Sequence, residues 1–234
     1  MRDRSQIGNR WTARHRFLCQ MAGELKGEKI LDLGCGFGWF EEYAVSKDCD
    51  TIVGVDADHK MIERARREVP GGEFINGDIT GIKFHPGTFS VVSMFDVLEH
   101  LPIDGVVPLL VTSKLLLKQG GRILMSVPYC GALSTALDPA FYLGHRHYRL
   151  SNLKKYLDEA ELKMSRVSFA GGLWESVSMI WLYFSKWVLG REMPFAEYLE
   201  RKRTREYGRV RSEPDRASLV TMFVEAVLKG PSDA

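Results

Sequence analysis

The stretch MFDVLEHLP, residues 94–102, brings three titratable side chains together. Asp96, Glu99 and His100 stand at positions i, i+3 and i+4, so a helix would present them on one face. Carboxylates with an imidazole suit a divalent metal, and they equally suit a histidine base that an acid orients. The same spacing is typical of the solvated first turn of a helix. The three interpretations remain open at this point.

Two further histidines, His145 and His147, stand in GHRHYRL, beyond the apolar run RILMSVP. They are candidates for a base or a downstream metal ligand. An acid–base or substrate-orienting role for His100, His145 or His147 is favoured over a bound divalent cation. The hypothesis therefore assigns these histidines, with Asp96 and Glu99, to catalysis and assigns no residue to a metal.

A second constellation is the glycine run in ILDLGCGFG, residues 30–38. Gly34, Gly36 and Gly38 allow a sharp turn and a close approach of the backbone to a ligand, and the helix that follows offers free N–H groups. The spacing Gly-x-Gly-x-Gly differs from the Gly-x-Gly-x-x-Gly that holds a pyrophosphate. A nicotinamide-dependent dehydrogenase is therefore disfavoured.

Acidic residues stand at the ends of three apolar runs. Asp32 precedes the glycine run, Asp56 ends TIVGVD, and Asp78 ends EFINGD. A carboxylate placed like Asp56 can bind both hydroxyls of a ribose. A ligand with an amino acid moiety, a ribose and a base, but no phosphate, fits these groups.

The elements that must position these residues alternate along the chain. Apolar runs at 29–33, 51–56, 73–78, 89–95 and 122–128 predict buried strands. The segments between them predict helices at 9–22, 39–46, 59–69, capped by Asp58, and 103–118, ended by Gly120 and Gly121. This alternation predicts an α/β fold: a Rossmann-like, doubly wound, mostly parallel sheet.

The pattern is less regular after residue 150. A helix capped by Ser151 and a strand at 163–171 are expected, followed by an amphipathic helix at 173–189 and a charged, helical stretch at 195–215. The run SLVTMFVEAVLKG, 218–230, predicts a final strand, with a helix as the alternative. We expect one domain over 1–234, in which 172–216 is a helical insertion.

The composition of the 234 residues is that of an ordinary globular protein, 45% hydrophobic and 26% charged. A net charge of +2 does not indicate a nucleic-acid partner. Four cysteines without paired spacing, and an N-terminus without a signal-peptide core, favour the cytoplasm. The apolar part of 173–189 is short for a transmembrane span.

The motifs ILDLGCGFG, VGVDAD, NGDI and FDVLEHL, in this order and spacing, resemble those of class I S-adenosylmethionine-dependent methyltransferases. Residues 27–170 are similar to the ubiquinone-biosynthesis O-methyltransferase, or methyltransferase type 11, branch. The resemblance implies a seven-stranded sheet with a C-terminal antiparallel hairpin. It also implies S-adenosylmethionine as the cofactor. Where that branch has Glu before its Glu-His pair, this chain has the shorter Asp96, which weakens the metal hypothesis.

The resemblance assigns a set of residues to the cofactor: Asp32, Gly34, Cys35, Gly36, Gly38, Asp56, Ala57, Asp78, Ile79, Met94 and Phe95. It implies that Asp32 lies near the amino group of the methionine moiety, that Asp56 holds the ribose hydroxyls and that Asp78 accepts from the adenine. Arg14 or Arg16 is a candidate for pairing with the methionine carboxylate.

The acceptor is left open by these motifs. O-methylation of a small or hydrophobic acceptor, including a lipid-linked one, is the main hypothesis. A non-catalytic S-adenosylmethionine-binding regulator and an RNA methyltransferase are the alternatives. The aromatic residues of 172–216, including Trp174, Trp181 and Trp187, predict a substrate lid, a peripheral membrane contact, core packing or a homodimer interface.

Overall fold

Helices and strands alternate through the computed structural model, which describes residues 11–131, 135, 139–142, 144–185, 190, 195–213 and 220–230. The first elements in chain order are α1 (Ala13–Ala22), β1 (Lys29–Leu33), α2 (Trp39–Ser46), β2 (Thr51–Asp56), α3 (His59–Glu68), β3 (Glu73–Asn76) and β4 (Phe89–Phe95). They are followed by η2 (Leu98–His100), η3 (Ile103–Gly105), α4 (Val106–Leu116), β5 (Leu117–Pro128), α6 (Pro139–Tyr142), α7 (Leu150–Glu159) and β6 (Leu162–Ala170). The last are α8 (Leu173–Phe184), α9 (Ala196–Tyr207) and β7 (Thr221–Leu228).

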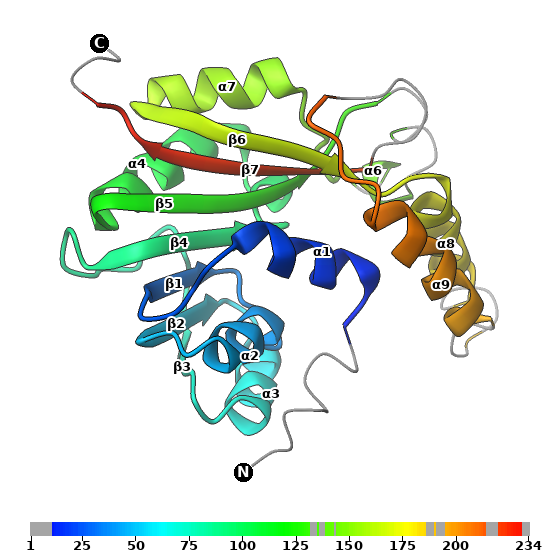
Figure 1. Cartoon of the computed structure of the whole chain (residues 1–234), viewed down its shortest axis with the longest axis horizontal. Coiled ribbons are helices and arrows are strands. Elements are labelled where there is room, and N and C mark those ends of the chain that lie inside the picture. Colours follow the sequence, from blue (N-terminus) through cyan, green and yellow to red (C-terminus); the bar gives the residue numbers. More distant parts are fainter. Residues whose placement is uncertain are drawn as a thin grey trace.

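The seven strands form one twisted sheet in the order β3-β2-β1-β4-β5-β7-β6 (Figure 1). Strands β1 to β5 pair in parallel, whereas β7 runs antiparallel to both of its neighbours, β5 and β6. The order reverses beside β1, so the carboxyl ends of β1 and β4 are the expected ligand-binding edge of an open α/β sheet. The predicted fold class is confirmed, including the final strand and the antiparallel pairing at the C-terminal end.

Helices cover both faces of the sheet because the strand side chains alternate between two apolar cores. Leu31 and Met94 belong to the core under α4 and α7. Ile30 and Phe95 belong to the core under α1 and α2. Strand β4 is buried at every residue, as a central strand must be.

A local capping signal explains the start of α3, and two other expected helix signals need correction. Asp58 caps α3 as predicted, accepting from the backbone N–H groups of Lys60 and Met61. Ser151 does not cap α7, because the helix begins at Leu150 after Arg149. Gly120 and Gly121 lie within β5 and do not end the preceding helix, because α4 already stops at Leu116.

Helices α8 and α9 lie between β6 and β7 in the chain and pack against each other beyond the carboxyl ends of the parallel strands (Figure 1). Helix α9 also packs against α1, and α6 packs against α8. The predicted helix at 173–189 is described only as far as Ser185, so Lys186, Trp187 and Val188 lie outside the described residues. No helix in the described ranges is both long and apolar enough to cross a membrane.

Candidate active site

The turn after β1 is shaped by three glycines in the left-handed region. Gly34, Gly36 and Gly38 have φ of 79°, 54° and 81°. A Cβ on Gly34 would lie 2.5 Å from Cγ2 of Val97, so only glycine lets this turn approach the segment after β4. A Cβ on Gly36 would meet nothing within 4 Å. The turn is therefore tight on its protein side and open at Gly36.

Asp56 joins the glycine turn to the end of β2. One carboxylate oxygen accepts from the backbone N–H of Gly36 at 2.8 Å, and the other accepts from the N–H of Asp58 at 2.8 Å. Asn76 fastens the next strand by donating its side-chain amide to the carbonyl oxygens of Asp56 and Ala57. Asn76 is not among the candidates expected from the sequence, where its signal was its place at the end of the apolar run EFIN.

A buried pair of carboxyl groups lies beneath the turn. Asp32 is 2% exposed and Glu41, on α2, is fully buried. The hydroxyl of Ser93 donates to Asp32 at 2.6 Å. Burial is the largest cause that raises the pKa of Asp32, to about 7, and burial with repulsion from Asp32 raises the pKa of Glu41 well above its usual value. Glu41 is not among the candidates expected from the sequence, although an acidic pair inside the apolar WFEEYAVS was a signal.

The remaining cofactor candidates differ in exposure. Asp78 is exposed, and its carboxylate accepts from the N–H and the hydroxyl of Thr80, which lowers its pKa. Ile79 is partly buried and Ala57 is exposed. The side chains of the other three candidates point into the protein: Cys35, Met94 and Phe95. Contacts to a ligand from those three would have to come from the backbone.

Asp96 takes a left-handed conformation, with φ of 58°, directly after β4. Its backbone N–H donates to the carbonyl oxygen of Ser126, and the Ser126 hydroxyl donates to its carboxylate at 2.6 Å. Arg14 of α1 forms an ion pair with the same carboxylate oxygen. Burial opposes the charge of Arg14, but the nearby Asp96 keeps its pKa raised. Arginine from the opening helix thus reaches the edge of the sheet.

Asp96, Glu99 and His100 do not share one α-helical face, which corrects the expectation from their spacing. Asp96 precedes the short 3₁₀ turn η2, since its left-handed backbone breaks the helical path. Glu99 is turned inward and is 4% exposed, whereas His100 is exposed. Only Asp96 and His100 of the three are therefore available at the surface of the site.

The segment 145–148 is fastened onto this turn. The Tyr148 hydroxyl donates to the carbonyl oxygen of Leu98 at 2.7 Å, and Arg146 donates to that of Leu101. These bonds bring the ring of His145 edge-on to that of His100, with centroids 4.5 Å apart. Partial desolvation, and then the neighbouring His145, lower the pKa of His100. His100 is therefore mainly neutral near neutral pH.

His147 lies apart from that pair. Its Nδ1 is 3.0 Å from the Thr135 hydroxyl, and its ring lies against Phe141 of α6. No group of three or more His, Cys, Asp or Glu side chains that could hold a metal occurs in the described part of the chain. The structure therefore brings together Asp96, His100 and His145, with Arg14 as an added member.

Comparison with known proteins agrees with this geometry. A family model described as a methyltransferase domain matches residues 30–121. Phosphoethanolamine N-methyltransferase 1 of Triticum aestivum is 32% identical over 135 residues, which are 56% of this chain and 26% of that protein. The ubiquinone biosynthesis O-methyltransferase of Thiobacillus denitrificans is 32% identical over 107 residues, 44% of this chain and 45% of that protein. The chain thus spans less than half the length of these relatives.

Solved structures share the fold across nearly the whole chain. A SAM dependent methyltransferase from Archaeoglobus fulgidus has a TM-score of 0.66 and 16% identity, covering 95% of this chain and 97% of its own. Magnesium protoporphyrin IX methyltransferase from Synechocystis PCC 6803, solved with bound SAH, has a TM-score of 0.62 and 14% identity, covering 93% of this chain and 84% of its own.

The sheet order and the glycine turn define an α/β protein of the doubly wound class. Residues 30–121 match a methyltransferase domain, and the similar curated proteins and solved structures include S-adenosylmethionine-dependent methyltransferases.

Proposed function

We propose that the protein transfers a methyl group from S-adenosylmethionine to an oxygen of a small or hydrophobic acceptor. The observation that carries the proposal is the pairing of His100 with His145 beside Asp96, at the strand edge that also holds the glycine turn. The cofactor supplies a methyl group on a positively charged sulfur, which needs no further activation. The protein's work is therefore alignment and proton removal.

The residues around the glycine turn fit such a cofactor. The open side of Gly36 leaves room for a ligand against the backbone. Nε of Arg14 is buried without a hydrogen-bond partner at the mouth of the site, and a carboxylate is the group that it would bind. Asp32 would meet the amino group, Asp56 the ribose hydroxyls and Asp78 the adenine, as the family resemblance implies.

His100 or His145 would take the proton of the acceptor hydroxyl. A neutral imidazole is required for that step, and the lowered pKa of His100 keeps it neutral near neutral pH. The carboxylate of Asp96, held by Ser126 and Arg14, would orient the acceptor or the imidazolium that forms. His147 and the buried Glu99 remain candidates for supporting roles.

The test is a screen of acceptors with labelled S-adenosylmethionine, beginning with quinone-like phenols, polyketides and lipid-linked sugars. With an acceptor found, His100→Ala and His145→Ala should each lower kcat, by about 10²–10⁴-fold for the true base. Affinity for S-adenosylmethionine, measured by titration calorimetry, should stay unchanged. His59→Ala, at the exposed start of α3, is the matched control and should leave kcat unchanged.

Three results would redirect the proposal. Full activity of both histidine variants would contradict the proton-transfer role. Tight cofactor binding with no S-adenosylhomocysteine formed from any acceptor would favour a regulatory protein. Methylation of RNA would replace the small-molecule acceptor. The relatives' names support either an N- or an O-acceptor, so the screen includes amines.

We also infer a cytoplasmic location, because the four cysteines are free thiols and none forms a disulfide within the described structure.

A further inference from the structure

Helix α8 is oriented opposite to an ordinary surface helix. Its polar residues face the protein: Glu175 is 2% exposed, and Ser176 and Ser178 are buried. Apolar residues on the other side of the helix face outward, with Ile180 40% and Phe184 41% exposed. A surface helix of a globular protein usually buries its apolar stripe. Ile180 and Phe184 are therefore not packed in a core, whereas Trp174 and Trp181 are half-buried.

Polar contacts from α9 hold α8 in this orientation. Arg203 donates to both carboxylate oxygens of Glu175, at 2.5 and 3.0 Å. The carboxylate of Glu206 accepts from the backbone N–H groups of Trp174 and Glu175, so it caps the start of α8. A Cβ on Gly172 would lie 2.8 Å from the Glu206 carboxyl carbon, so the cap fits closely. The outward apolar face is thus fixed by the fold.

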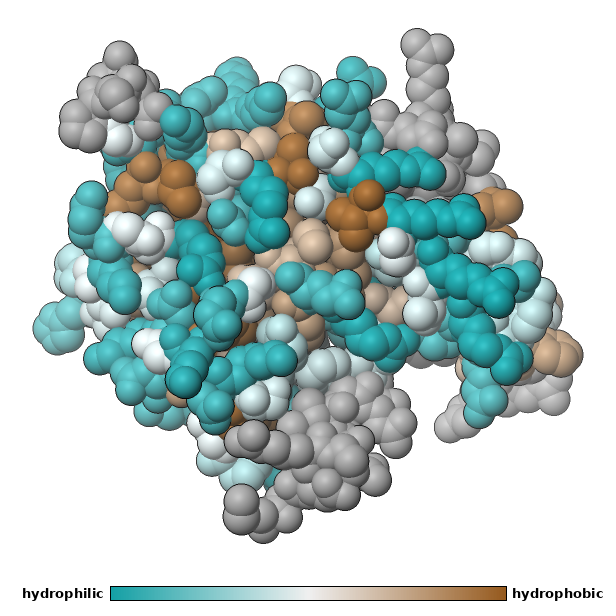
Figure 2. All heavy atoms as spheres, viewed as in Figure 1, coloured by the Kyte–Doolittle hydropathy of each residue, from teal (hydrophilic) through white to brown (hydrophobic). Residues whose placement is uncertain are grey.

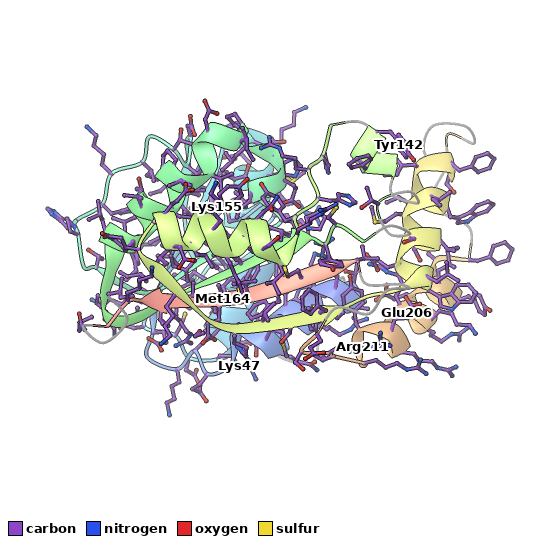
Figure 3. The ribbon with its side chains drawn as sticks, turned by 90° about the horizontal axis from the view of Figure 1, so that it is seen from above. Lys47, Tyr142, Lys155, Met164, Glu206 and Arg211 are labelled. Atoms are coloured by element: carbon purple, nitrogen blue, oxygen red, sulfur yellow. The ribbon has the colours of Figure 1, made fainter. Side chains whose placement is uncertain are left out.

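The exposed apolar residues of α6, α8 and the first turn of α9 form one surface, here called the end surface. It holds eight of the thirteen exposed large apolar or aromatic side chains among the described residues, including Phe195, which is 76% exposed. Ring side chains extend from α8 away from the sheet, with Tyr142 of α6 near one end of the helix (Figure 3). Such a concentration marks an interaction site.

A groove of about 610 Å³ crosses the end surface between α8 and α9. The described residues that line it are all apolar or aromatic: Val177, Ile180, Trp181, Phe195, Tyr198 and Leu199.

A basic stripe borders this groove on α9. Tyr198, Arg201, Lys202 and Arg205 stand at i, i+3, i+4 and i+7, which is one helical face. Lys202 lies over the rings of Trp174 and Tyr198, 5.1 and 5.4 Å from their centroids. Hydrophilic side chains run along α9 in the space-filling view (Figure 2). The acids of this helix that lie near α8 and α1 are already engaged, since Glu206 caps α8 and Glu200 pairs with Arg16.

We propose that the end surface docks on an anionic lipid bilayer. Outward aromatic and aliphatic side chains would enter the headgroup region, and the basic stripe would contact anionic headgroups. The purpose of docking rests on the function proposed above, because a docked protein would receive a membrane-borne acceptor at the neighbouring strand edge. Docking itself is measured without catalysis.

Charge complementarity favours a bilayer over other occupants. A two-fold contact between copies places the same patch on both partners, which brings the bordering basic stripes toward each other. An acceptor chain lying in the groove alone would leave Leu182 and Phe184, which do not line the groove, exposed to water. An anionic bilayer covers the apolar residues and neutralises the stripe together.

The test is co-sedimentation of the full chain with vesicles. Phosphatidylcholine vesicles containing phosphatidylglycerol should bind the protein, and added salt should weaken binding. Vesicles of phosphatidylcholine alone should bind it weakly. Phe184→Glu should lower partitioning about tenfold or more, the loss expected for one large apolar side chain. Leu115→Glu, at another exposed apolar residue, on α4, is the control and should bind like the unchanged protein.

The charge variant Arg201→Glu with Arg205→Glu should abolish the preference for anionic vesicles, whereas Lys60→Glu with Arg67→Glu on α3 should preserve it. The proposal would be overturned if the control variants lost as much vesicle binding as the test variants. It would also be overturned if the folded protein did not bind anionic vesicles. A dimer in analytical ultracentrifugation that Phe184→Glu dissociates, without vesicle binding, would assign the end surface to a second copy. Vesicle binding without methyl transfer would keep the docking and reject the proposed function.

Discussion

Two buried carboxyl groups under the glycine turn cannot both be charged at low cost. Asp32 and Glu41 lie out of water, and Asp32 has Ser93 as a hydroxyl donor. If Glu41 carries the proton, its carboxyl group can donate to Asp32, which leaves Asp32 charged to meet a cationic amino group. The pair therefore places a negative charge at the turn while limiting the cost of its burial.

The raised pKa values make stability depend on pH. A carboxyl group whose pKa is higher in the folded than in the unfolded protein contributes stability at low pH, and loses it as pH rises through the folded pKa. For Asp32 this window runs from its ordinary value of 3.8 to about 7. The free energy of unfolding should therefore fall as pH rises through this window toward neutrality.

Glu41→Gln should flatten this dependence, because one buried acid is removed and the amide can still donate to Asp32. At about pH 8 the variant should be more stable than the unchanged chain by on the order of 1–3 kcal/mol. Urea unfolding at about pH 5 and pH 8 measures this. Glu63→Gln, a half-buried surface residue of α3 that pairs with Arg66, is the control and should follow the pH dependence of the unchanged protein. An equally steep dependence in Glu41→Gln would contradict the explanation.

At the scale of elements, one buried ion pair connects α8 to α9. Glu175 and Arg203 are 3% and 13% exposed in their side chains, and Arg203 also pairs with Glu200, which in turn pairs with Arg16 of α1. This chain of charges links both helices to the opening helix, whose Arg14 reaches Asp96. The end surface and the candidate active site are thus joined through α1 and α9.

Arg203→Leu should destabilise the protein by about 3–5 kcal/mol, because it leaves the Glu175 charge buried without its partner. The double variant with Glu175→Leu should recover most of that loss, since no unpaired charge remains. Thermal unfolding and limited proteolysis of α8 measure the two effects. Arg205→Leu, on the exposed stripe, is the control. A double variant as unstable as Arg203→Leu would mean that Glu175 does not cause the loss.

At the scale of the whole molecule, α8 and α9 are attached at one end of a sheet whose strands pair without them. Ala170 and Thr221, at the ends of β6 and β7 where the helices leave and return, are register partners. The glycine turn, Asp56 and Asp78 lie on the other half of the sheet, around β1 to β3. Cofactor binding and acceptor handling should therefore be separable.

Deleting residues 172–212 should abolish methyl transfer and vesicle binding while sparing S-adenosylmethionine binding. The deletion also removes Tyr207, which packs against Phe17, so the shortened chain should unfold at a lower temperature. Titration calorimetry with the cofactor, on protein shown to be folded by circular dichroism, provides the measurement. Unchanged turnover would reject a role for these helices in handling the acceptor.

The sequence by itself determined the sheet and the edge at which β1, β2 and β3 end. The spacing of apolar residues that predicts strands and helices can be read from neighbouring residues. The same holds for the glycines and acids at or just after the ends of β1, β2 and β3. Parallel strands then bring those ends to one edge without further information. That is why α2, β2 and β4 have the predicted bounds, whereas the roles of Asp32, Asp56 and Asp78 toward the cofactor stay predictions.

Only the tertiary structure decided which polar residues meet. His100 joins His145 because Tyr148 and Arg146 bind the turn after β4, and Asp96 joins Arg14 because α1 crosses the sheet edge. The sequence of α8 likewise did not show which face points outward. A helical wheel shows that the helix is amphipathic but not which of its faces meets the protein. Glu175 on α8 binds Arg203 of α9, and Glu206 on α9 caps the start of α8. These long-range contacts fix which side of α8 faces water. Such contacts have no local period from which they could be predicted.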